Sequence, residues 1–256
     1  MKQNKYDEAA FFNTYSRMNR SVKGLEGAGE WPVFRELIPH LQGKNVLDLG
    51  CGFGWHCRYA ADQGAAEVTG VDISRNMLEK AREKSPDKEI TFVRRPLEDF
   101  EYESDTYDVI ISSLAFHYVR DFRQLCHSLY KALKPGGTLV FSVEHPIFTS
   151  RAEQDWFYSE DGRRLHWPVD RYQEEGERRT NFLAEDVVKY HRTVSTYIES
   201  LLQAGFLIRS VKEPAPSQER ILENSEWQDE ARRPMFLIVS AAKEQQAGIT
   251  VIQAHA

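Results

Sequence analysis

The chain has 256 residues, of which 41% are hydrophobic, 12% aromatic and 28% charged, a composition that excludes disordered, collagen-like and disulfide-scaffold proteins. Its 33 Lys and Arg against 39 Asp and Glu give a net charge of −6, which disfavours bulk binding of nucleic acid. Because no apolar run approaches a membrane span and the N-terminus lacks a secretory signal, we expect a cytoplasmic protein that does not bind the membrane.

The first 43 residues carry no strand-like run, and aromatic residues such as Tyr15 and Trp31 lie there among polar ones. We predict that residues 1–43 form a helical cap or lid. From residue 44 to 242, short aliphatic runs alternate with helix-like segments, which predicts an α/β domain with a helix-covered parallel sheet. The predicted strands are 45–49, 67–71, 90–93, 107–112, 138–143, 206–211 and 235–241, and the predicted helices are 55–62, 76–84, 122–133 and 193–204. The last two strands are joined without a predicted helix, which implies that one runs antiparallel to the rest.

The segment 144–192 interrupts this alternation after the fifth strand and is too long and irregular for a simple connection. It is rich in aromatic residues, Trp156 among them. Long ordered loops commonly serve as lids or binding loops, so we predict a substrate lid, and packing as a satellite core is the alternative. Residues 243–256 are predicted to form a flexible tail.

A glycine-rich loop directly follows the first predicted strand, in the sequence DLGCGFG at residues 48–54. Its G-x-G-x-G array lets the backbone turn sharply and approach a nucleotide-like ligand. Asp72 ends the next strand, where a carboxylate can accept hydrogen bonds from both hydroxyls of a ribose. A dinucleotide-binding site is the competing interpretation, but its third glycine would come one residue later, and Asp48 would repel a pyrophosphate. Asp48 could instead orient a cationic ligand, and S-adenosylmethionine combines adenosine with positive charge.

From residue 43 to 242 the sequence resembles the class I S-adenosylmethionine-dependent methyltransferases. The matching segments are DLGCGFG at 48–54, VDISRNML at 71–78, YDVI at 107–110 and LKPGGTL at 133–139. The resemblance is greatest to small-molecule enzymes of the quinone-biosynthesis group. It implies a Rossmann-like, doubly wound seven-stranded sheet of order 3-2-1-4-5-7-6, with strand seven antiparallel.

The resemblance also implies a set of cofactor-binding residues. They are Asp48, Gly50, Cys51, Gly52, Gly54, Asp72, Ile73, Met77, Leu97, Glu98, Ser112 and Leu114. Asp72 would take the ribose, Ile73 and Met77 would flank the adenine, and the segment 112–114 would pass under the methionine moiety. Relatives often have an acid where Pro96 stands, so the backbone near Leu97 and Glu98, or the Glu98 carboxylate, would replace it. The cofactor is expected to be S-adenosylmethionine, with S-adenosylhomocysteine as product and no metal, because the three cysteines match no zinc pattern.

Three histidines are candidates for a proton acceptor, which is needed only when the methyl acceptor arrives protonated. His145 is the first choice because it follows strand five, next to Glu144, whose charge could raise imidazole basicity. His117 and His191 are the alternatives, and a packing or capping role stays open for all three.

Four further residues are assigned to the substrate pocket or its lid: Tyr15, Trp31, Glu144 and Trp156. The three aromatic rings could shield the sulfonium and attract it through their quadrupoles.

These observations predict a methyltransferase that acts on a small-molecule acceptor by O-, N- or C-methylation. An RNA or protein methyltransferase is one alternative, disfavoured by the acidic pI near 5.8 and by the absence of an added nucleic-acid module. A non-catalytic, cofactor-binding regulatory protein is the other. Assembly into a homodimer is left open.

Overall fold

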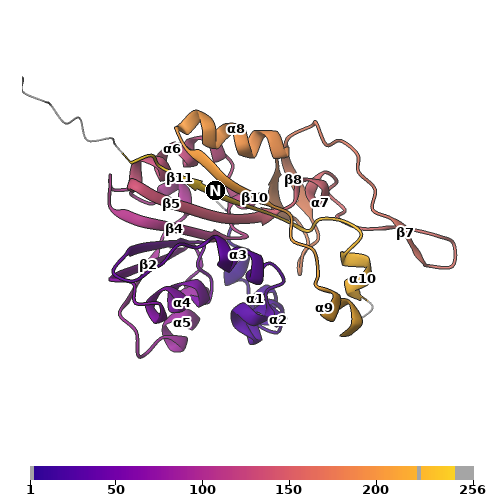
Figure 1. Cartoon of the computed structure of the whole chain (residues 1–256). Helices are drawn as coiled ribbons and strands as arrows, with labels where there is room; N and C mark the ends of the chain where they lie inside the picture. Colours follow the sequence, from indigo (N-terminus) through magenta and orange to yellow (C-terminus); the bar gives the residue numbers. More distant parts are fainter. Residues whose placement is uncertain (1–2, 224–225, 246–256) are drawn as a thin grey trace, which may run out of the picture.

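A seven-stranded sheet forms the centre of the computed structural model, which describes residues 3–223 and 226–245 (Figure 1). Its strand order is β10-β11-β5-β4-β1-β2-β3. The strands are β1 Asn45–Leu49, β2 Glu67–Asp72, β3 Ile90–Arg94, β4 Tyr107–Ser113, β5 Leu133–Glu144, β10 Leu207–Lys212 and β11 Phe236–Ala242. The first five pair in parallel, whereas β11 runs antiparallel to both β5 and β10. The predicted order and the antiparallel last strand are therefore confirmed.

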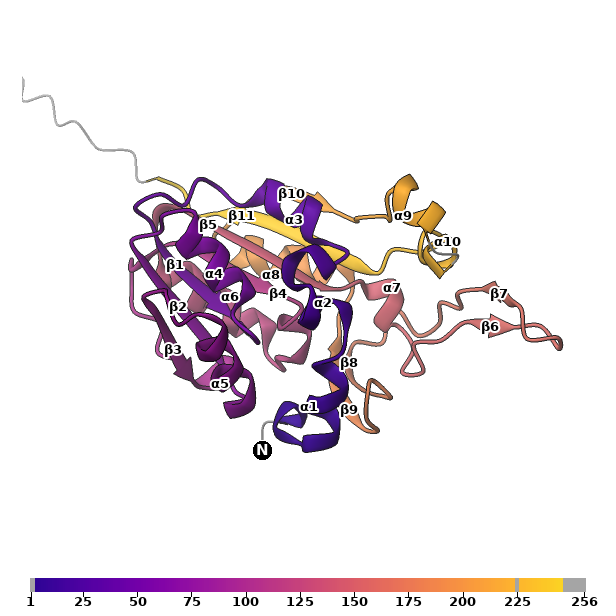
Figure 2. The same ribbon diagram turned by 90° about the horizontal axis from the view of Figure 1, so that it is seen from below.

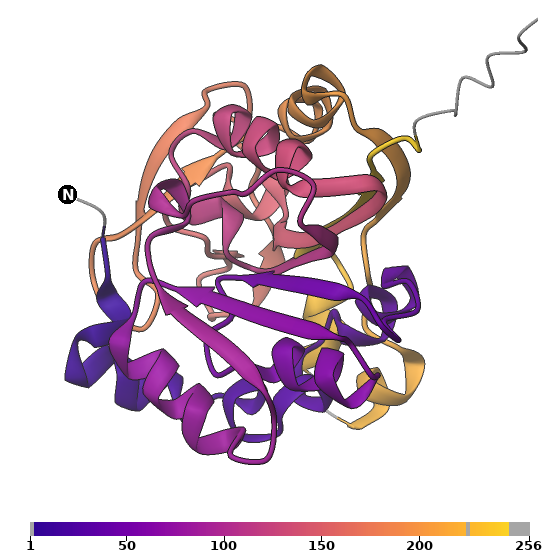
Figure 3. The same ribbon diagram turned by 90° about the vertical axis from the view of Figure 1, so that its left-hand side faces the viewer.

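Helices cover both faces of this sheet, as Figure 3 shows from the side of the molecule. The helices are α3 Trp31–Leu37, α4 Trp55–Asp62 and α5 Arg75–Lys84 on one face, and α6 Phe122–Ala132 and α8 Val194–Ala204 on the other. Side chains cap three of them: Ser74, Asp121 and Thr193 each accept a hydrogen bond from a backbone amide of the first turn. Gly205 then ends α8 with a φ of 102°, a left-handed conformation that glycine adopts without strain.

The cap predicted for residues 1–43 differs in extent in the structure, because α3 packs on the sheet and only the preceding segment lies at its carboxyl edge as short helices. They are η1 Lys5–Asp7, α1 Ala9–Tyr15, α2 Asn19–Val22 and η2 Gly24–Gly27. In Figure 2 the cap lies beside the strands β8 Gly176–Thr180 and β9 Val187–His191. Two segments distant in sequence therefore meet at the edge where α/β folds bind ligands.

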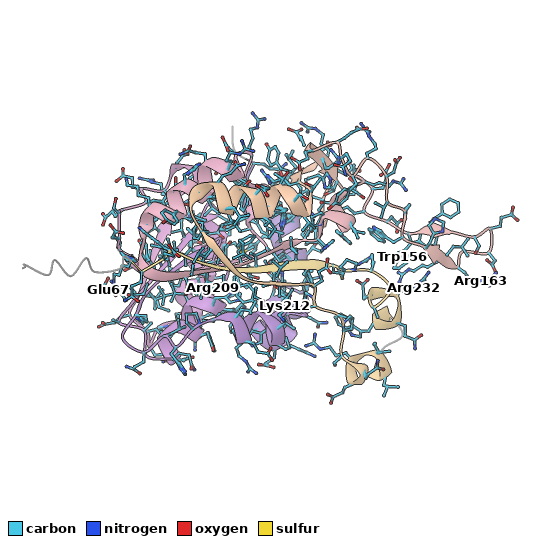
Figure 4. All side chains as sticks on the ribbon, turned by 45° about the horizontal axis from the view of Figure 1, so that its top comes forward. Glu67, Trp156, Arg163, Arg209, Lys212 and Arg232 are labelled. Atoms are coloured by element: carbon cyan, nitrogen blue, oxygen red, sulfur yellow. The ribbon has the colours of Figure 1, made fainter. Side chains whose placement is uncertain are left out.

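The insertion after β5 contains elements that the sequence does not predict. It begins with α7 Pro146–Thr149 and continues into two antiparallel hairpins, one of β6 Phe157–Tyr158 with β7 Arg164–His166 and one of β8 with β9. Trp156 packs edge-on against Trp167 at 5.4 Å, and the Arg233 guanidinium lies 4.0 Å from the Trp167 ring centre. Figure 4 shows Trp156 and Arg232 close to the hairpin, and their ring-to-cation distance is 4.6 Å. Trp156 thus belongs to a satellite cluster, the alternative given for these aromatics.

The linker between β10 and β11 corrects one expectation. It contains two short helices, α9 Gln218–Glu223 and α10 Glu226–Glu230, although no helix was predicted there. Arg220 of α9 stacks on Trp227 of α10 at 5.5 Å and donates a hydrogen bond to the Glu26 carbonyl. These contacts hold the two helices in place, whereas the prolines of the linker had suggested a segment without helices. Strand β5 also starts earlier than predicted, because Leu133 already pairs with Tyr107.

At the C-terminus, Lys243 is anchored by an ion pair with Asp105 at 2.7 Å. The rest of the predicted tail, from residue 246 on, lies outside the described residues. Among the residues that are described, no helix is both long and apolar enough to cross a membrane.

Candidate functional site

The glycine loop after β1 has a backbone that only glycine adopts readily. Gly50, Gly52 and Gly54 have φ values of 73°, 51° and 73°, all in the left-handed region. A Cβ on Gly50 would lie 2.3 Å from the Cβ of Ala115, so a side chain at this position would collide with the segment after β4. The loop and that segment therefore approach each other closely at the sheet edge.

Asp72 ends β2 directly beside this loop, as predicted. Its Oδ2 accepts a hydrogen bond from the Gly52 amide at 3.0 Å, and its Oδ1 accepts one from the Ser74 amide at 2.8 Å. Burial raises the pKa of Asp72 to about 6. A carboxylate offers about four lone-pair sites, so two remain for further donors such as a pair of ribose hydroxyls.

Asp48 and Cys51 lie beneath the loop rather than on its surface. Asp48 is 1% exposed and accepts a hydrogen bond from the Cys57 thiol at 3.2 Å, while burial raises the pKa of Asp48 to about 7. Its Oδ1 has no partner among the described residues. Cys51 is also a buried side chain, and its burial raises the pKa of the thiol to about 11. A direct contact of Asp48 or Cys51 with the cofactor stays a prediction.

The segment after β4 is held in place by the neighbouring strands. The Ser112 hydroxyl donates to the Leu49 carbonyl at 2.8 Å, and the Leu114 amide donates to the Ser142 carbonyl at 2.9 Å. Leu114 has a φ of 54°, an uncommon conformation for a leucine that often marks ligand sites. The proposed path under the methionine moiety stays a prediction, supported by this close approach to Gly50.

A cavity of about 400 Å³ lies beyond Asp72, at the ends of β2 and β3. Its lining residues are Asn4, Ile73, Arg94, Arg95 and Pro96. Ile73 thus faces the space where the adenine is expected, whereas Met77 and Leu97 are buried in the core. Glu98 is exposed on the short helix η3 Leu97–Asp99.

The cap is attached to this edge through Asp7. Its carboxylate accepts hydrogen bonds from the Ser74 hydroxyl at 2.6 Å and from the Asn76 amide at 3.0 Å, and it pairs with Arg94 at 3.3 Å. These hydrogen bonds lower the pKa of Asp7 against the opposing effect of burial. A carboxylate at the N-terminus of α5 is also stabilised by the helix dipole. Asp7 therefore attaches the cap, as a latch, next to Asp72.

Aromatic rings of the cap lie over the glycine loop. Tyr15 meets Phe53 of the loop edge-on at 5.9 Å, and it meets Tyr6 at 5.2 Å. The Tyr6 hydroxyl lies 3.4 Å from the hydroxyl of Tyr118, which follows β4. Burial is the main cause that raises the pKa of Tyr6, Tyr15 and Tyr118, and so all three are neutral donors at physiological pH. The predicted site residue Tyr15 is brought to the loop, whereas Tyr6 and Tyr118 were missed.

A buried ion pair completes the cap side. Arg20 pairs with Glu30, and the Glu30 Oε1 accepts a hydrogen bond from the Ser113 hydroxyl at 3.2 Å. Glu30 Oε2 is buried and has no hydrogen-bond partner among the described residues. Sequence gave little signal for this pair, because both residues lie in a polar segment without periodicity.

Glu144 faces Lys189, not His145. The Lys189 Nζ lies 2.6 Å from Glu144 Oε1 and 3.1 Å from Gln154 Oε1, and its side chain is only 1% exposed. Despite burial, the Lys189 charge lowers the pKa of Glu144. The pKa of His145 is affected by burial and by Glu213, so the expected effect of Glu144 on His145 does not arise. Lys189 had not been recognised because a single lysine in an irregular insertion carries no pattern.

The carboxylate beside His145 is Glu213. The His145 Nε2 lies 2.7 Å from Glu213 Oε1, and its Nδ1 accepts the Ile147 amide at 3.1 Å. Nε2 therefore carries the proton, and burial lowers the pKa of the ring. Neither nitrogen of His145 offers a free lone pair in this arrangement.

The other two histidines are also buried and neutral. His191 contacts the Thr149 hydroxyl at 2.8 Å and the Tyr172 carbonyl at 2.9 Å, which occupies both ring nitrogens. Burial lowers the pKa of His117 to about 4, and its Nδ1 accepts a long hydrogen bond of 3.4 Å from the Glu144 amide. His117 is thus the histidine next to Tyr118 and Glu144, with Nε2 as its protonated nitrogen.

Trp31 packs in the core, away from the tyrosines and histidines at the sheet edge. It is 4% exposed and meets Phe34, His56 and Tyr59 between α3 and α4. A role in shielding a sulfonium is therefore not supported for Trp31, nor for Trp156 in its satellite cluster. Over residues 3–223 and 226–245, no group of three His, Cys, Asp or Glu side chains could hold a metal ion.

Comparison with known proteins gives concordant matches. The methyltransferase domain family matches residues 47–141. A crystal structure of an S-adenosylmethionine dependent methyltransferase from Mesorhizobium loti is 46% identical, with 86% of this chain and 100% of that chain covered and a TM-score of 0.80. A Listeria monocytogenes protein of known structure is 49% identical, with coverages of 85% and 99% and a TM-score of 0.79. A Haemophilus influenzae protein is 37% identical over 246 residues, which are 93% of this chain and 96% of that protein.

The chain therefore belongs to the class I S-adenosylmethionine-dependent methyltransferases, as its motifs predicted. It is an enzyme, and S-adenosylmethionine is its cofactor. The residues present fit that cofactor, because Asp72 retains acceptor capacity beside a glycine loop and a cavity opens next to it.

Proposed function

We propose that this enzyme methylates a small molecule that carries a hydroxyl or amino group and binds between the cap and the ends of β4 and β5. The observation that carries the proposal is the convergence of polar groups there. The hydroxyl oxygens of Tyr6 and Tyr118 lie 3.4 Å apart. One carboxylate oxygen of Glu30 is buried and receives no hydrogen bond from the described residues. An O–H or N–H of an acceptor would satisfy that oxygen, whose burial otherwise costs free energy.

The charges of this space support a compact polar acceptor. Arg20 is paired with Glu30, and Lys189 with Glu144, so the two ion pairs contribute no net charge. A polyanion such as RNA would find no uncompensated cation among these four residues, in contrast to the basic surfaces that bind nucleic acids.

Catalysis is proposed to depend on alignment. Bound S-adenosylmethionine supplies a methyl group on a cationic sulfur, and methyl transfer requires an in-line approach of the acceptor atom. Tyr6 and Tyr15 would exclude water from this space, and the hydroxyl of Tyr118 and the Nε2 proton of His117 would orient the acceptor. In each of the three candidate histidines the unprotonated ring nitrogen already accepts a hydrogen bond, which supports positioning over general-base catalysis.

More distant relatives are consistent with a small acceptor group. A phosphoethanolamine N-methyltransferase of Caenorhabditis elegans is 32% identical over 104 residues, 24% of its length. A malonyl-[acyl-carrier protein] O-methyltransferase of Salmonella typhimurium is 32% identical over 107 residues, 41% of its length. The first relative supports an amino group on a small molecule as acceptor, whereas the printed substrate of the second is carried by a protein. Both matches leave most of the relative uncovered, so neither identifies the acceptor of this enzyme.

The proposal is tested with methyl-labelled S-adenosylmethionine and a cell extract separated into a small-metabolite fraction and a macromolecular fraction. We expect label in the small-metabolite fraction only, and loss of that label with the Tyr118→Phe/Glu30→Gln variant. Transfer into RNA or protein would support the alternative acceptor class. Absence of transfer to either fraction, despite tight cofactor binding, would favour a regulatory protein.

His145→Gln is expected to leave turnover within about threefold of the wild type, because the histidine contacts Glu213 and the Ile147 amide rather than an open space. The glutamine can keep one of these hydrogen bonds, so a modest fall in melting temperature is expected instead. Turnover should be measured across pH at saturating acceptor. A loss of about 10²-fold would reinstate His145 as general base.

A further inference from the structure

The cavity next to Asp72 is poor in side-chain hydrogen-bond acceptors. Of its five lining residues, the two arginines carry only donors, and Ile73 and Pro96 have apolar side chains, so Asn4 alone brings a side-chain acceptor. The backbone carbonyls of Ile73, Arg94 and Pro96 each already accept a hydrogen bond from the protein.

The orientation of the Asn4 amide is fixed by Asp7. The Asn4 Nδ2 donates to Asp7 Oδ2 at 2.7 Å, and a carboxylate oxygen can only accept, so the amide oxygen must be the other atom. That oxygen, Oδ1, is buried and has no hydrogen-bond partner among the described residues. A buried acceptor without a donor is costly, and such an atom in a native structure calls for a ligand or another explanation.

Asn4 lines the cavity, and the position of the cavity relative to the expected ribose is given by Asp72. The cavity begins at Ile73, the residue after Asp72, and the Arg95 amide donates to the Asp72 carbonyl at 3.0 Å. A base attached to that ribose would therefore enter the cavity between Ile73 and Pro96, whose apolar side chains suit the faces of a flat ring. The edge of adenine carries one exocyclic amino group, which is a donor.

We infer that Asn4, on the N-terminal cap, recognises the exocyclic amino group of the cofactor's adenine through Oδ1. The cap then has two roles, since it covers the reaction space and also reads the base. The assignment explains the uncompensated oxygen and gives the cavity an acceptor for that amino group. It concerns the cofactor only, and it is independent of the identity of the methyl acceptor.

The test compares the binding of S-adenosylhomocysteine with that of S-inosylhomocysteine, in which a carbonyl oxygen replaces the amino group. Calorimetry on the full chain needs no methyl acceptor. The wild type should prefer S-adenosylhomocysteine by about tenfold or more, because two acceptors would face each other in the inosine complex. In Asn4→Ala this preference should fall to within about twofold.

Two further variants accompany this comparison. Asp7→Ala removes the latch and also the carboxylate that orients the Asn4 amide, so it should weaken both ligands and lower their ratio as well. Asn13→Ala changes an exposed asparagine of the same cap and should change neither affinity.

Three results would overturn the inference. One is a wild type that binds both ligands equally. Another is an Asn4→Ala variant in which both affinities fall while their ratio is kept, which would make Asn4 a structural residue. The third is loss of discrimination in Glu98→Gln with retention in Asn4→Ala, which would assign the base contact to Glu98.

Discussion

Replacement of Asp72 by alanine is expected to weaken the binding of S-adenosylhomocysteine at least about tenfold. Hydrogen bonds to a charged acceptor contribute roughly 1.5–3 kcal/mol each, and about 1.4 kcal/mol corresponds to a tenfold change in Kd. The substitution also removes the acceptor of the Gly52 and Ser74 amides, which loosens the glycine loop. Calorimetry measures the loss, and Asp62→Ala, on an exposed position of α4, serves as the matched control.

The same carboxyl predicts a pH dependence. Burial raises the pKa of Asp72 to about 6, and ribose hydroxyls donate to its ionised form. Affinity should therefore be greatest above pH 6 and fall as pH decreases through that value, by up to about tenfold per pH unit. Asp72→Asn should bind weakly at every pH without this slope. An affinity of wild type that does not change between pH 8 and 5, or an unchanged affinity of Asp72→Ala, would place the ribose elsewhere.

Lys189→Met should destabilise the fold by about 3 kcal/mol or more, because removal of one partner leaves the other charge buried and unpaired. The side chains of Lys189 and Glu144 are 1% and 14% exposed, so solvent screens this pair little. Chemical denaturation gives the difference in the free energy of unfolding. Lys131→Met, at an exposed position of α6, should cost little.

The sign of the pH effect is a second check on this pair. In the wild type the pKa of Glu144 is lowered, so its stabilising contribution is present above the unfolded pKa and is lost as pH falls through the folded value. Without Lys189 that pKa should rise, and the loss of stability should be largest at neutral and alkaline pH. The double variant Lys189→Met/Glu144→Gln should regain much of the stability. A small effect of the single variant, or no recovery in the double one, would contradict a tight ion pair.

The central sheet could be predicted because its strands and helices carry strong local signals. Residues 45–49 form a short strand-like segment before a glycine loop, and 122–132 have helical spacing, and both elements appear in the structure at these positions. Asp72 could be placed at the sheet edge beside the glycine loop because it ends a predicted strand. These elements are determined by residues that are close together in the sequence, so a local pattern is enough to predict them.

The acceptor side could not be predicted in the same way, because its contacts join distant segments. Arg20 meets Glu30 under the cap, and Lys189 returns through a long insertion to Glu144. Nothing in the sequence indicates that Glu213, which follows β10, meets His145 at the end of β5, so the partner of its ring was misassigned. The surroundings of Asn4 could not be predicted either, because its buried oxygen without a partner arises only when the cap is folded against the rest of the chain.

Hydrogen exchange of the cap tests most directly that this enzyme encloses its cofactor beneath the N-terminal segment. Backbone amides of residues 5–22 should exchange more slowly when S-adenosylhomocysteine is bound to the wild type, because Tyr6, Tyr15 and the Asp7 latch close over the glycine loop. Asp7→Ala should lose much of this protection at saturating ligand, whereas α6 should exchange alike in both proteins. Equal exchange of the cap with and without ligand, at concentrations where binding is complete, would contradict closure and leave the cap as a packing element.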